Sequence, residues 1–162
     1  IRDSQRTFQT NLPLESASNI MKIALTCLLL VVLVSCSQYQ RDFQEEVKKK
    51  APEESVEGAW KGEWKSEVNG HHGPVWCLVS KTPNKEKEWI FRYRAGWGFL
   101  QFGDYKHVVE ADKKDKTLPL NASMKLPGNF GTYNVKGTLT PKKFSTRFKG
   151  NGDKGTMVLA RP

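Results

Sequence analysis

The sequence is poor in residues that cross-link a chain. Its 162 residues include three cysteines, and two of them, Cys27 and Cys36, lie near the N-terminus. Cys77 is then the single thiol of the remaining chain, so no disulfide can form within it. Cys77 lies in the apolar run VWCLV, where a cysteine behaves as a small buried hydrophobic residue. These positions exclude a disulfide-stabilised scaffold.

Metal-binding and catalytic motifs are also missing. The sequence contains no His-x-His, Cys-x-x-Cys or carboxylate cluster, whereas a metal site needs three or four convergent ligands. We interpret His71 and His72 as turn residues and His107 as a polar group at the rim or in the core. No side chain stands in a context that marks a nucleophile. We therefore expect no enzymatic activity, no catalytic residue, no cofactor and no metal.

Apolar runs are short, and the longest one lies near the N-terminus. Met21 and Lys22 precede an apolar stretch from Ile23 to Val34, which is shorter than the roughly 20 residues that a membrane-spanning helix needs. A positive residue followed by a short apolar run predicts a secretory signal peptide. The polar segment from Ile1 to Ile20 precedes Met21, and we interpret it as translated from upstream of the true start. A cytoplasmic N-terminal tail is the alternative.

The end of this signal, Leu33 to Cys36, resembles the bacterial lipobox. In that motif the cysteine after a small residue receives diacylglycerol, is further acylated with a chain such as palmitate, and becomes the first residue of the mature protein. The resemblance implies a lipid-anchored protein of the bacterial cell envelope. Ser37 after the cysteine points to the outer membrane, facing the periplasm or the exterior. Cleavage elsewhere, with Cys36 incidental, is the alternative.

The composition divides the chain into four segments. They are 1–20, the upstream segment; 21–35, the lipoprotein signal peptide; 36–56, the acylated cysteine and a flexible linker; and 57–162, a β-barrel domain. The linker is polar and contains Pro52, so we expect it to be disordered, with room for one or two helical turns between Arg41 and Lys50.

The last segment has the pattern of an all-β domain. Glycine, proline and Asn-Gly recur at intervals of about 8–12 residues, and alternation is clearest where Trp89, Phe91 and Tyr93 face away from Arg92 and Arg94. This predicts an antiparallel up-and-down meander of about eight or nine short strands, forming a barrel of about eight. The expected strands are 58–66, 74–81, 88–95, 98–102, 105–111, 117–125, 131–138, 144–149 and 156–161.

The stretch GAWKGEW decides between a helix and a strand at the start of this domain. Gly58 and Gly62 make a helix weak, since each glycine costs about 1 kcal/mol relative to alanine. In a strand, Trp60, Gly62 and Trp64 share one face, so both indoles enter the core. The expected inward side chains are Trp60, Trp64, Trp89, Phe91, Tyr93, Phe99, Tyr133, Phe144, Phe148, Met157 and Leu159.

At this point the domain resembles the calycin superfamily, which includes the lipocalins and avidins. Those barrels open with Gly-x-Trp, matched here by Gly58-Ala59-Trp60, and carry a basic residue at the end of the last strand, matched by Arg161. The resemblance implies a closed up-and-down barrel in which Arg161 stacks on Trp60. It also implies an interior that accepts an apolar ligand.

Two functions fit these features, and we rank ligand binding first. In it, the barrel holds a small apolar or amphipathic ligand, and the candidate ligand-binding residues are Trp64, Ser66, Asn69, Arg92 and Tyr93. Since an eight-stranded barrel is only just wide enough for one small ligand, and its predicted interior is aromatic, we expect a shallow pocket at one mouth.

The alternative is a structural or interaction domain with a filled core. The net charge of +9 at pH 7 favours anionic neighbours, so its basic surface would contact an anionic envelope polymer. Tryptophans among lysines also occur in proteins that bind single-stranded nucleic acid, but a signal peptide argues against that partner. We therefore expect a membrane contact through the lipid anchor and no nucleic acid.

The lipobox generates a direct prediction. Mass spectrometry of the protein from the membrane fraction should find Cys36 as the N-terminal residue carrying diacylglycerol, because two or three acyl chains anchor a protein stably. The Cys36→Ala variant should leave the membrane fraction. Unchanged recovery of that variant in membranes would contradict the lipid anchor.

Overall fold

A computed structural model describes residues 38–125 and 131–162 of the chain. The predicted signal peptide at 21–35 and the acylation site at Cys36 lie outside the described residues. The chain divides into two compact units, Ile1–Gln40 and Arg41–Pro162, and the domain described below lies in the second. Among the helices of the described part, none has the length and apolar composition that spanning a membrane requires.

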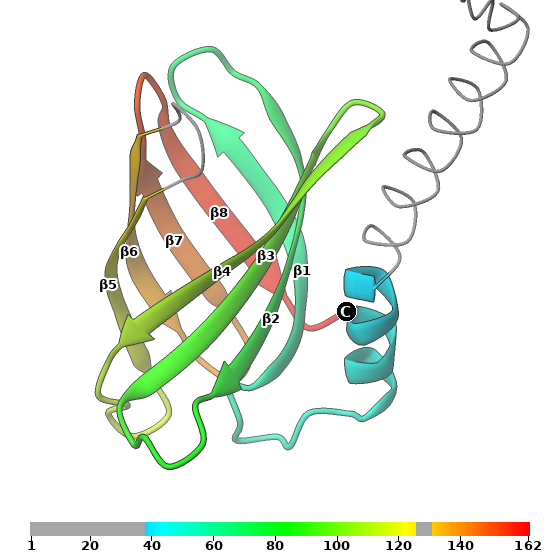
Figure 1. Cartoon of the computed structure of the whole chain (residues 1–162), viewed down its shortest axis with the longest axis vertical. Coiled ribbons are helices and arrows are strands. Elements are labelled where there is room, and N and C mark those ends of the chain that lie inside the picture. The colour runs from blue at the N-terminus through cyan, green and yellow to red at the C-terminus, as the bar shows by residue number, and fades with distance from the viewer. Residues whose placement is uncertain (1–37, 126–130) are drawn as a thin grey trace, which may run out of the picture. The chain divides into compact units, whose positions relative to one another are not determined.

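The second unit is an eight-stranded antiparallel barrel (Figure 1). Neighbouring strands in the sheet follow the order β4-β3-β2-β1-β8-β7-β6-β5, which confirms the predicted all-β up-and-down fold. The strands are β1 (Gly58–Ser66), β2 (His72–Lys81), β3 (Glu88–Trp97), β4 (Leu100–Glu110), β5 (Leu118–Lys125), β6 (Thr132–Leu139), β7 (Phe144–Lys149) and β8 (Lys154–Ala160).

The expected strands 98–102 and 105–111 are one strand, β4. Gly103 and Asp104, which separate the two expected strands, instead form an irregularity in the β3–β4 ladder, where the register shifts between Tyr93 and Arg94. Gly103 and Asp104 both have positive φ, 105° and 120°. A bulge of this kind bends a strand and increases its twist without ending it, which corrects the prediction of two strands.

The barrel is nearly closed rather than fully closed. The first and last strands are paired, with Trp64 opposite Met157 and Gly62 opposite Leu159. The edges of the sheet are β4 and β5, which lie side by side in the barrel wall without a ladder of backbone hydrogen bonds. The architecture is consistent with the calycin-like barrel that the sequence suggested, but its wall has a seam between β4 and β5.

Gly62 is required by a close approach between β1 and β8. It lies between the two inward indoles, and a Cβ atom placed on it would collide with the backbone carbonyl of Val158. Glycine therefore allows the strands to pack closely enough for Trp60 and Trp64 to enter the interior one above the other. Trp60 is fully buried, as predicted from the strand pattern.

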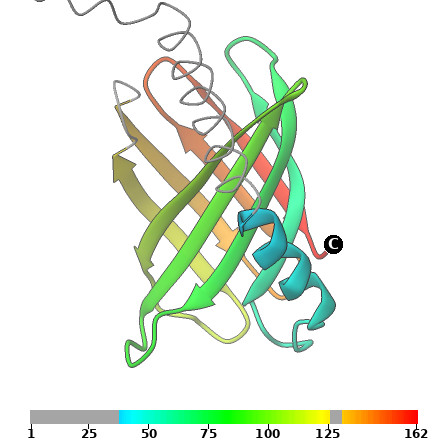
Figure 2. The same cartoon turned by 45° about the vertical axis from the view of Figure 1, so that its right-hand side comes forward.

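Two ends of the barrel can be distinguished in Figures 1 and 2. The closed end holds the start of β1 and the end of β8, and large side chains fill it. There Trp60 and Phe91 each meet the Phe144 ring edge-on, at centroid distances of 6.0 and 5.9 Å. The open end carries the β1–β2, β3–β4 and β7–β8 turns. Phe99, predicted to point inward, lies in the β3–β4 turn instead and is 95% exposed.

A helix over residues 38–48 precedes the barrel, and its part from Arg41 on belongs to the barrel's own unit. Asp42 forms an ion pair with Arg92 of β3 at 2.7 Å, and Phe43 is buried. Further along, Val56 is buried and its carbonyl accepts a hydrogen bond from Trp60 Nε1 at 3.0 Å. Within the segment 36–56, expected as a linker with one or two helical turns between Arg41 and Lys50, the helix and the buried side chains of Phe43 and Val56 thus contact the barrel.

Arg161 locks the closed end of the barrel. Its guanidinium carbon lies 3.9 Å from the centroid of the Trp60 ring, which is the geometry that the resemblance implies for these positions. The same guanidinium donates hydrogen bonds to the carbonyls of Glu57 at 2.7 Å and Ala59 at 3.3 Å. It also donates to the carbonyls of Ser55 and Pro141. One side chain therefore ties the end of β8 to the entry of β1 and to the β6–β7 turn.

This lock gives a prediction for stability. Trp60→Ala should lower the free energy of unfolding by about 3–5 kcal/mol, because truncation leaves a cavity in a filled region. Arg161→Ala should lower it by about 1.5–3 kcal/mol, because hydrogen bonds from a charged donor are lost. In urea unfolding, the double variant should lose less than the sum by about 0.5–2 kcal/mol, the value of the cation–π contact.

Two controls separate the contributions. Arg161→Lys keeps the charge but not the fork of donors, so it should remain well below the parent in stability. Lys81 lies over Trp89 at 5.8 Å, and this more distant pair should show a smaller coupling in the same cycle. Additive losses for Trp60 and Arg161 would contradict the lock.

Candidate functional site

The open half of the barrel contains an apolar cavity. Its volume is about 470 Å³, within the range of about 300–1,000 Å³ that is usual for small-molecule sites. Apart from one histidine, its lining is aliphatic or aromatic. The lining residues are Val75, Tyr93, Ala95, Trp97, Leu100, Phe102, Tyr105, His107, Met124, Tyr133, Val135 and Met157.

A second hollow of about 300 Å³ adjoins the first. The two hollows lie next to each other in the interior, because both are lined by Val75, Ala95, Phe102, Tyr133 and Met157. The second hollow extends the space toward Trp64, Phe148 and the β7–β8 turn. The expectation of a pocket confined to one mouth of the barrel therefore agrees with the geometry, although the space is larger than a shallow depression.

Trp64 shapes the wall of this space. Its indole Nε1 donates a hydrogen bond to the Gly96 carbonyl on β3 at 2.9 Å, so the ring crosses β2 on the inner face. It passes over Gly73, where an added Cβ would collide with Gly96 and crowd the indole nitrogen. The indole is thus held in place by its own hydrogen bond and by a glycine beneath it.

His107 is a buried polar residue of the cavity wall. It is 4% exposed and forms a hydrogen bond with the Ser123 backbone on β5, which bridges the β4–β5 seam. Its Nε2 atom is buried without a hydrogen-bond partner in the described part of the chain, so Nδ1 makes the bond to Ser123. Burial lowers the pKa of His107, against the opposing effect of that bond. A neutral imidazole that donates through Nδ1 leaves Nε2 as an acceptor.

The structure brings together two of the five candidate ligand-binding residues. Trp64 and Tyr93 both face the interior space, and the Tyr93 hydroxyl contacts the Cys77 thiol. Cys77 is fully buried, and burial raises its pKa well above the ordinary value. The thiol therefore remains protonated and fills the core.

Ser66 and Asn69 serve the β1–β2 turn instead of the cavity. The Ser66 hydroxyl donates to Asp153 at 2.6 Å and accepts from the backbone N–H groups of Val68 and Asn69. The Asn69 side-chain oxygen accepts from the His71 N–H at 2.9 Å. These bonds hold the turn in place, and neither residue is among those that line the cavity.

Arg92 lies on the outer wall of the barrel. Its guanidinium makes two hydrogen bonds to Asp104, at 2.8 and 2.7 Å, and an ion pair with Asp42. The two carboxylates raise its pKa further. The arginine therefore joins the helix to β3 and β4, and it is not among the residues that line the cavity.

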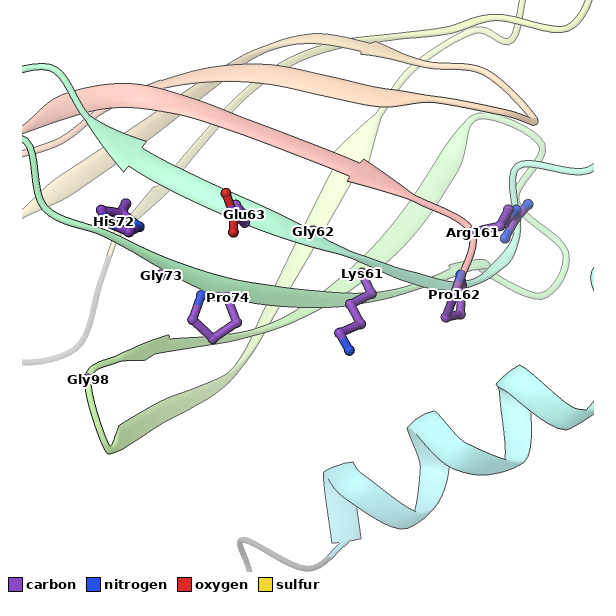
Figure 3. A pocket seen from close by; sticks show the side chains of 9 residues that line it. All are labelled: Lys61, Gly62, Glu63, His72, Gly73, Pro74, Gly98, Arg161 and Pro162. Carbon is purple, nitrogen blue, oxygen red and sulfur yellow. The ribbon is translucent and has the colours of Figure 1, made fainter.

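A larger surface hollow, of about 600 Å³, lies on the outside of β1 and β2 (Figure 3). Its charged residues, Lys61, Glu63 and Arg161, are spread along the strands and do not converge on one point. No group of three or more histidine, cysteine, aspartate or glutamate side chains suited to a metal ion occurs in residues 38–125 and 131–162. The apolar cavity inside the barrel is therefore the stronger candidate site.

Sequence reasoning missed most of the β4 and β5 contribution to this site. Tyr105 and His107 alternate with Lys106 and Val108 along β4, a pattern that identifies the inward face. The division of β4 into two expected strands hid the continuity of that alternation. Nothing in the sequence indicates that Nε2 of His107 is left without a partner, because that depends on where β5 lies.

The buried histidine gives a prediction for pH dependence. Because burial lowers the pKa of His107 below its ordinary 6.5, the unfolded chain takes up the proton first as the pH falls. The free energy of unfolding should therefore be higher above about pH 6.5 and decrease as the pH drops through that value. Urea unfolding at about pH 7.5 and about pH 5 measures the difference. His107→Leu should reduce it, whereas His72→Leu, at an exposed position, should leave it unchanged.

Comparison with known proteins adds no relative to this picture. No family model, no curated protein and no solved structure matches the chain. We therefore infer its function from the geometry of the barrel.

Proposed function

We propose that this chain is a non-catalytic binding protein of the bacterial cell envelope, which holds one small amphipathic molecule in the open half of a calycin-like barrel. The observation that carries the proposal is the apolar cavity of about 470 Å³ with one buried, unpartnered polar atom, His107 Nε2. A buried polar atom without a partner costs about 1–3 kcal/mol. A ligand that supplies the missing hydrogen bond recovers part of that cost.

The lining selects the apolar part of the ligand. Tyr93, Phe102 and Tyr133 supply aromatic faces, and Val75, Val135 and Met157 supply aliphatic surface. Burying hydrocarbon against such walls contributes about 0.8 kcal/mol for each CH₂ group. An alkyl chain or a small ring system fits this environment, and a strongly charged molecule does not.

His107 selects the polar part of the ligand. Because its neutral imidazole donates to Ser123 through Nδ1, the unpartnered Nε2 is a hydrogen-bond acceptor within the cavity wall. The matching ligand group is a hydrogen-bond donor such as a hydroxyl. We therefore propose an amphiphile with one hydroxyl group and a hydrocarbon body as the ligand class.

The envelope location is the second part of the proposal and rests on the sequence alone. The lipobox-like segment ending at Cys36 supports a lipid anchor, with the barrel outside the cytoplasm and no nucleic-acid partner. The absence of catalysis is likewise proposed from the composition of the lining, which combines one imidazole with phenol and hydrocarbon groups. The alternative function is a structural or interaction domain whose basic surface contacts an anionic polymer. That function would leave the cavity without a role.

Binding can be tested with the fluorescent apolar probe phenylnaphthylamine. The full chain should bind the probe, and decanol should displace it more effectively than methyl decyl ether by about fivefold, the value of one net hydrogen bond of about 1 kcal/mol. Ala95→Phe, which places a ring in the shared wall of both hollows, should abolish probe binding. His107→Leu should bind the probe but lose the preference for decanol.

The matched control is Val158→Phe. Val158 lies on β8 with its side chain half exposed, so the same ring is added outside the barrel and probe binding should persist. Circular dichroism and urea unfolding check that both variants keep the fold. Equal probe binding by Ala95→Phe and the parent would contradict the cavity as the binding site.

A further inference from the structure

The β3–β4 turn at the open end presents an unusual amount of hydrocarbon to solvent. Phe99 is 95% exposed, and Trp97, Leu100 and Phe102 are 48%, 49% and 43% exposed. We call these four residues the apolar tip. Contiguous exposed hydrophobic groups on a monomer mark a contact site for a partner or a membrane. Phe99 in particular makes no contribution to the core, so its presence is unexplained by folding.

The apolar tip is continuous with the cavity. Trp97, Leu100 and Phe102 line the cavity wall with one side and reach solvent with the other. The Trp97 ring also stacks on His71 of the β1–β2 turn, at a centroid distance of 5.0 Å. The tip is therefore a braced structure at the mouth, and hydrocarbon extends without interruption from Phe99 into the barrel.

Lysines surround the mouth, and their charges are not neutralised. Lys65, Lys125, Lys149 and Lys154 occupy the ends of strands at the open end and are exposed. In the described part of the chain none of them forms an ion pair. They therefore present positive charge that an anionic surface can meet.

The carboxylates of the turns at this end are already engaged. Glu67 pairs with Arg147 at 2.6 Å, and Asp153 accepts hydrogen bonds from the Ser66 hydroxyl and the Lys154 N–H. At the closed end, three lysines, Lys85, Lys87 and Lys116, are each paired with a carboxylate. The open end thus combines free positive charge with exposed hydrocarbon.

We propose that the open end docks on a membrane surface rich in anionic lipid, with the apolar tip inserted among the acyl chains. Aromatic side chains are favoured at the boundary between head groups and hydrocarbon. Lysines near an anionic leaflet add electrostatic attraction, and shallow insertion of an apolar face adds to it. In this orientation the cavity mouth opens onto the acyl layer, which is a source of amphiphiles.

This docking differs from attachment through Cys36. A lipid anchor holds the chain near a membrane but leaves the barrel free to turn, whereas the tip fixes which end faces the lipid. It also differs from the proposed ligand site, because Phe99 belongs to the tip and not to the cavity lining. The two proposals can therefore fail independently.

Fluorescence quenching by lipids with brominated acyl chains tests the insertion. In the full chain, Phe99→Trp places an indole at the tip, and Val158→Trp places one on the half-exposed outer wall. With brominated phosphatidylglycerol vesicles, the added indole at position 99 should be strongly quenched and the one at position 158 should not. Any attachment through the N-terminal segment is common to both variants, so the difference reports the tip alone.

Charge is tested in the Phe99→Trp background. Lys149→Gln with Lys154→Gln should raise the lipid concentration needed for half of the quenching by about fivefold for each lysine. Lys142→Gln with Lys143→Gln makes the same change of charge at the closed end, on exposed side chains, and should leave that concentration unchanged. Replacing phosphatidylglycerol by phosphatidylcholine should weaken the quenching in the parent background.

Three results would overturn the proposal. One is equal quenching at positions 99 and 158, and another is an equal effect of the two lysine pairs. The third is a dimer of the parent that Phe99→Ser converts to monomer without any lipid, since a second copy would then be the occupant of the tip. Phe99→Ser should lose lipid insertion but still bind phenylnaphthylamine, and Ala95→Phe should show the reverse, which separates this surface from the ligand site.

Discussion

The Arg161 guanidinium joins three parts of the chain that meet at the closed end of the barrel. It lies on the Trp60 ring and donates to carbonyls on the segment entering β1 and on the β6–β7 turn. The lock keeps β1 beside β8 at this end, and it holds the indole where it fills the interior. With that end filled by Trp60, Phe91 and Phe144, the empty volume of the barrel is confined to the other end.

The open half contains a cavity, and several of the side chains that line it are small. Val75, Ala95 and Val135 are among them, whereas the closed half is filled by the large buried rings named above. The bulge at Gly103–Asp104 bends β4, and the β4–β5 seam is spanned by the hydrogen bond of His107 to the Ser123 backbone. The same side chain therefore joins the seam and belongs to the cavity wall.

Much of the barrel could be read from alternation along the sequence. The bounds of β1 and β7 and the inward positions of Trp60, Trp64 and Phe144 follow from a period of two with turn residues between the strands. The contact between Trp60 and Arg161 required a family resemblance, because no local pattern links residues a hundred positions apart. Local sequence patterns were therefore sufficient to predict strands, but not to predict contacts between residues on strands that are distant in the sequence.

The errors have physical causes that differ from site to site. Phe99 was predicted to point inward from the alternation of inward and outward side chains along a strand. It lies in a turn, where side chains do not alternate between two faces. Gly103 and Asp104 separate two expected strands because glycine is common in turns. In the structure both have positive φ, a conformation that bulges use as well as turns. Arg92 faces away from Tyr93 by the alternation itself, so its place on the outer wall was already implied by the strand pattern. The helix over 38–48 is stabilised by tertiary contacts such as Asp42 with Arg92, which composition alone does not reveal.

The pairing of β1 with β8 also constrains the order of events during synthesis. Each neighbouring pair from β1–β2 to β7–β8 can form from local sequence, apart from the β4–β5 seam, but the β1–β8 ladder needs the last strand of the domain. Contacts between distant segments form late, since the loop between them must be closed first. A ribosome-bound chain that lacks β8 leaves the inner face of its unfinished sheet exposed, and such a surface is prone to aggregate. The barrel of a nascent chain therefore closes only after β8 has left the ribosome.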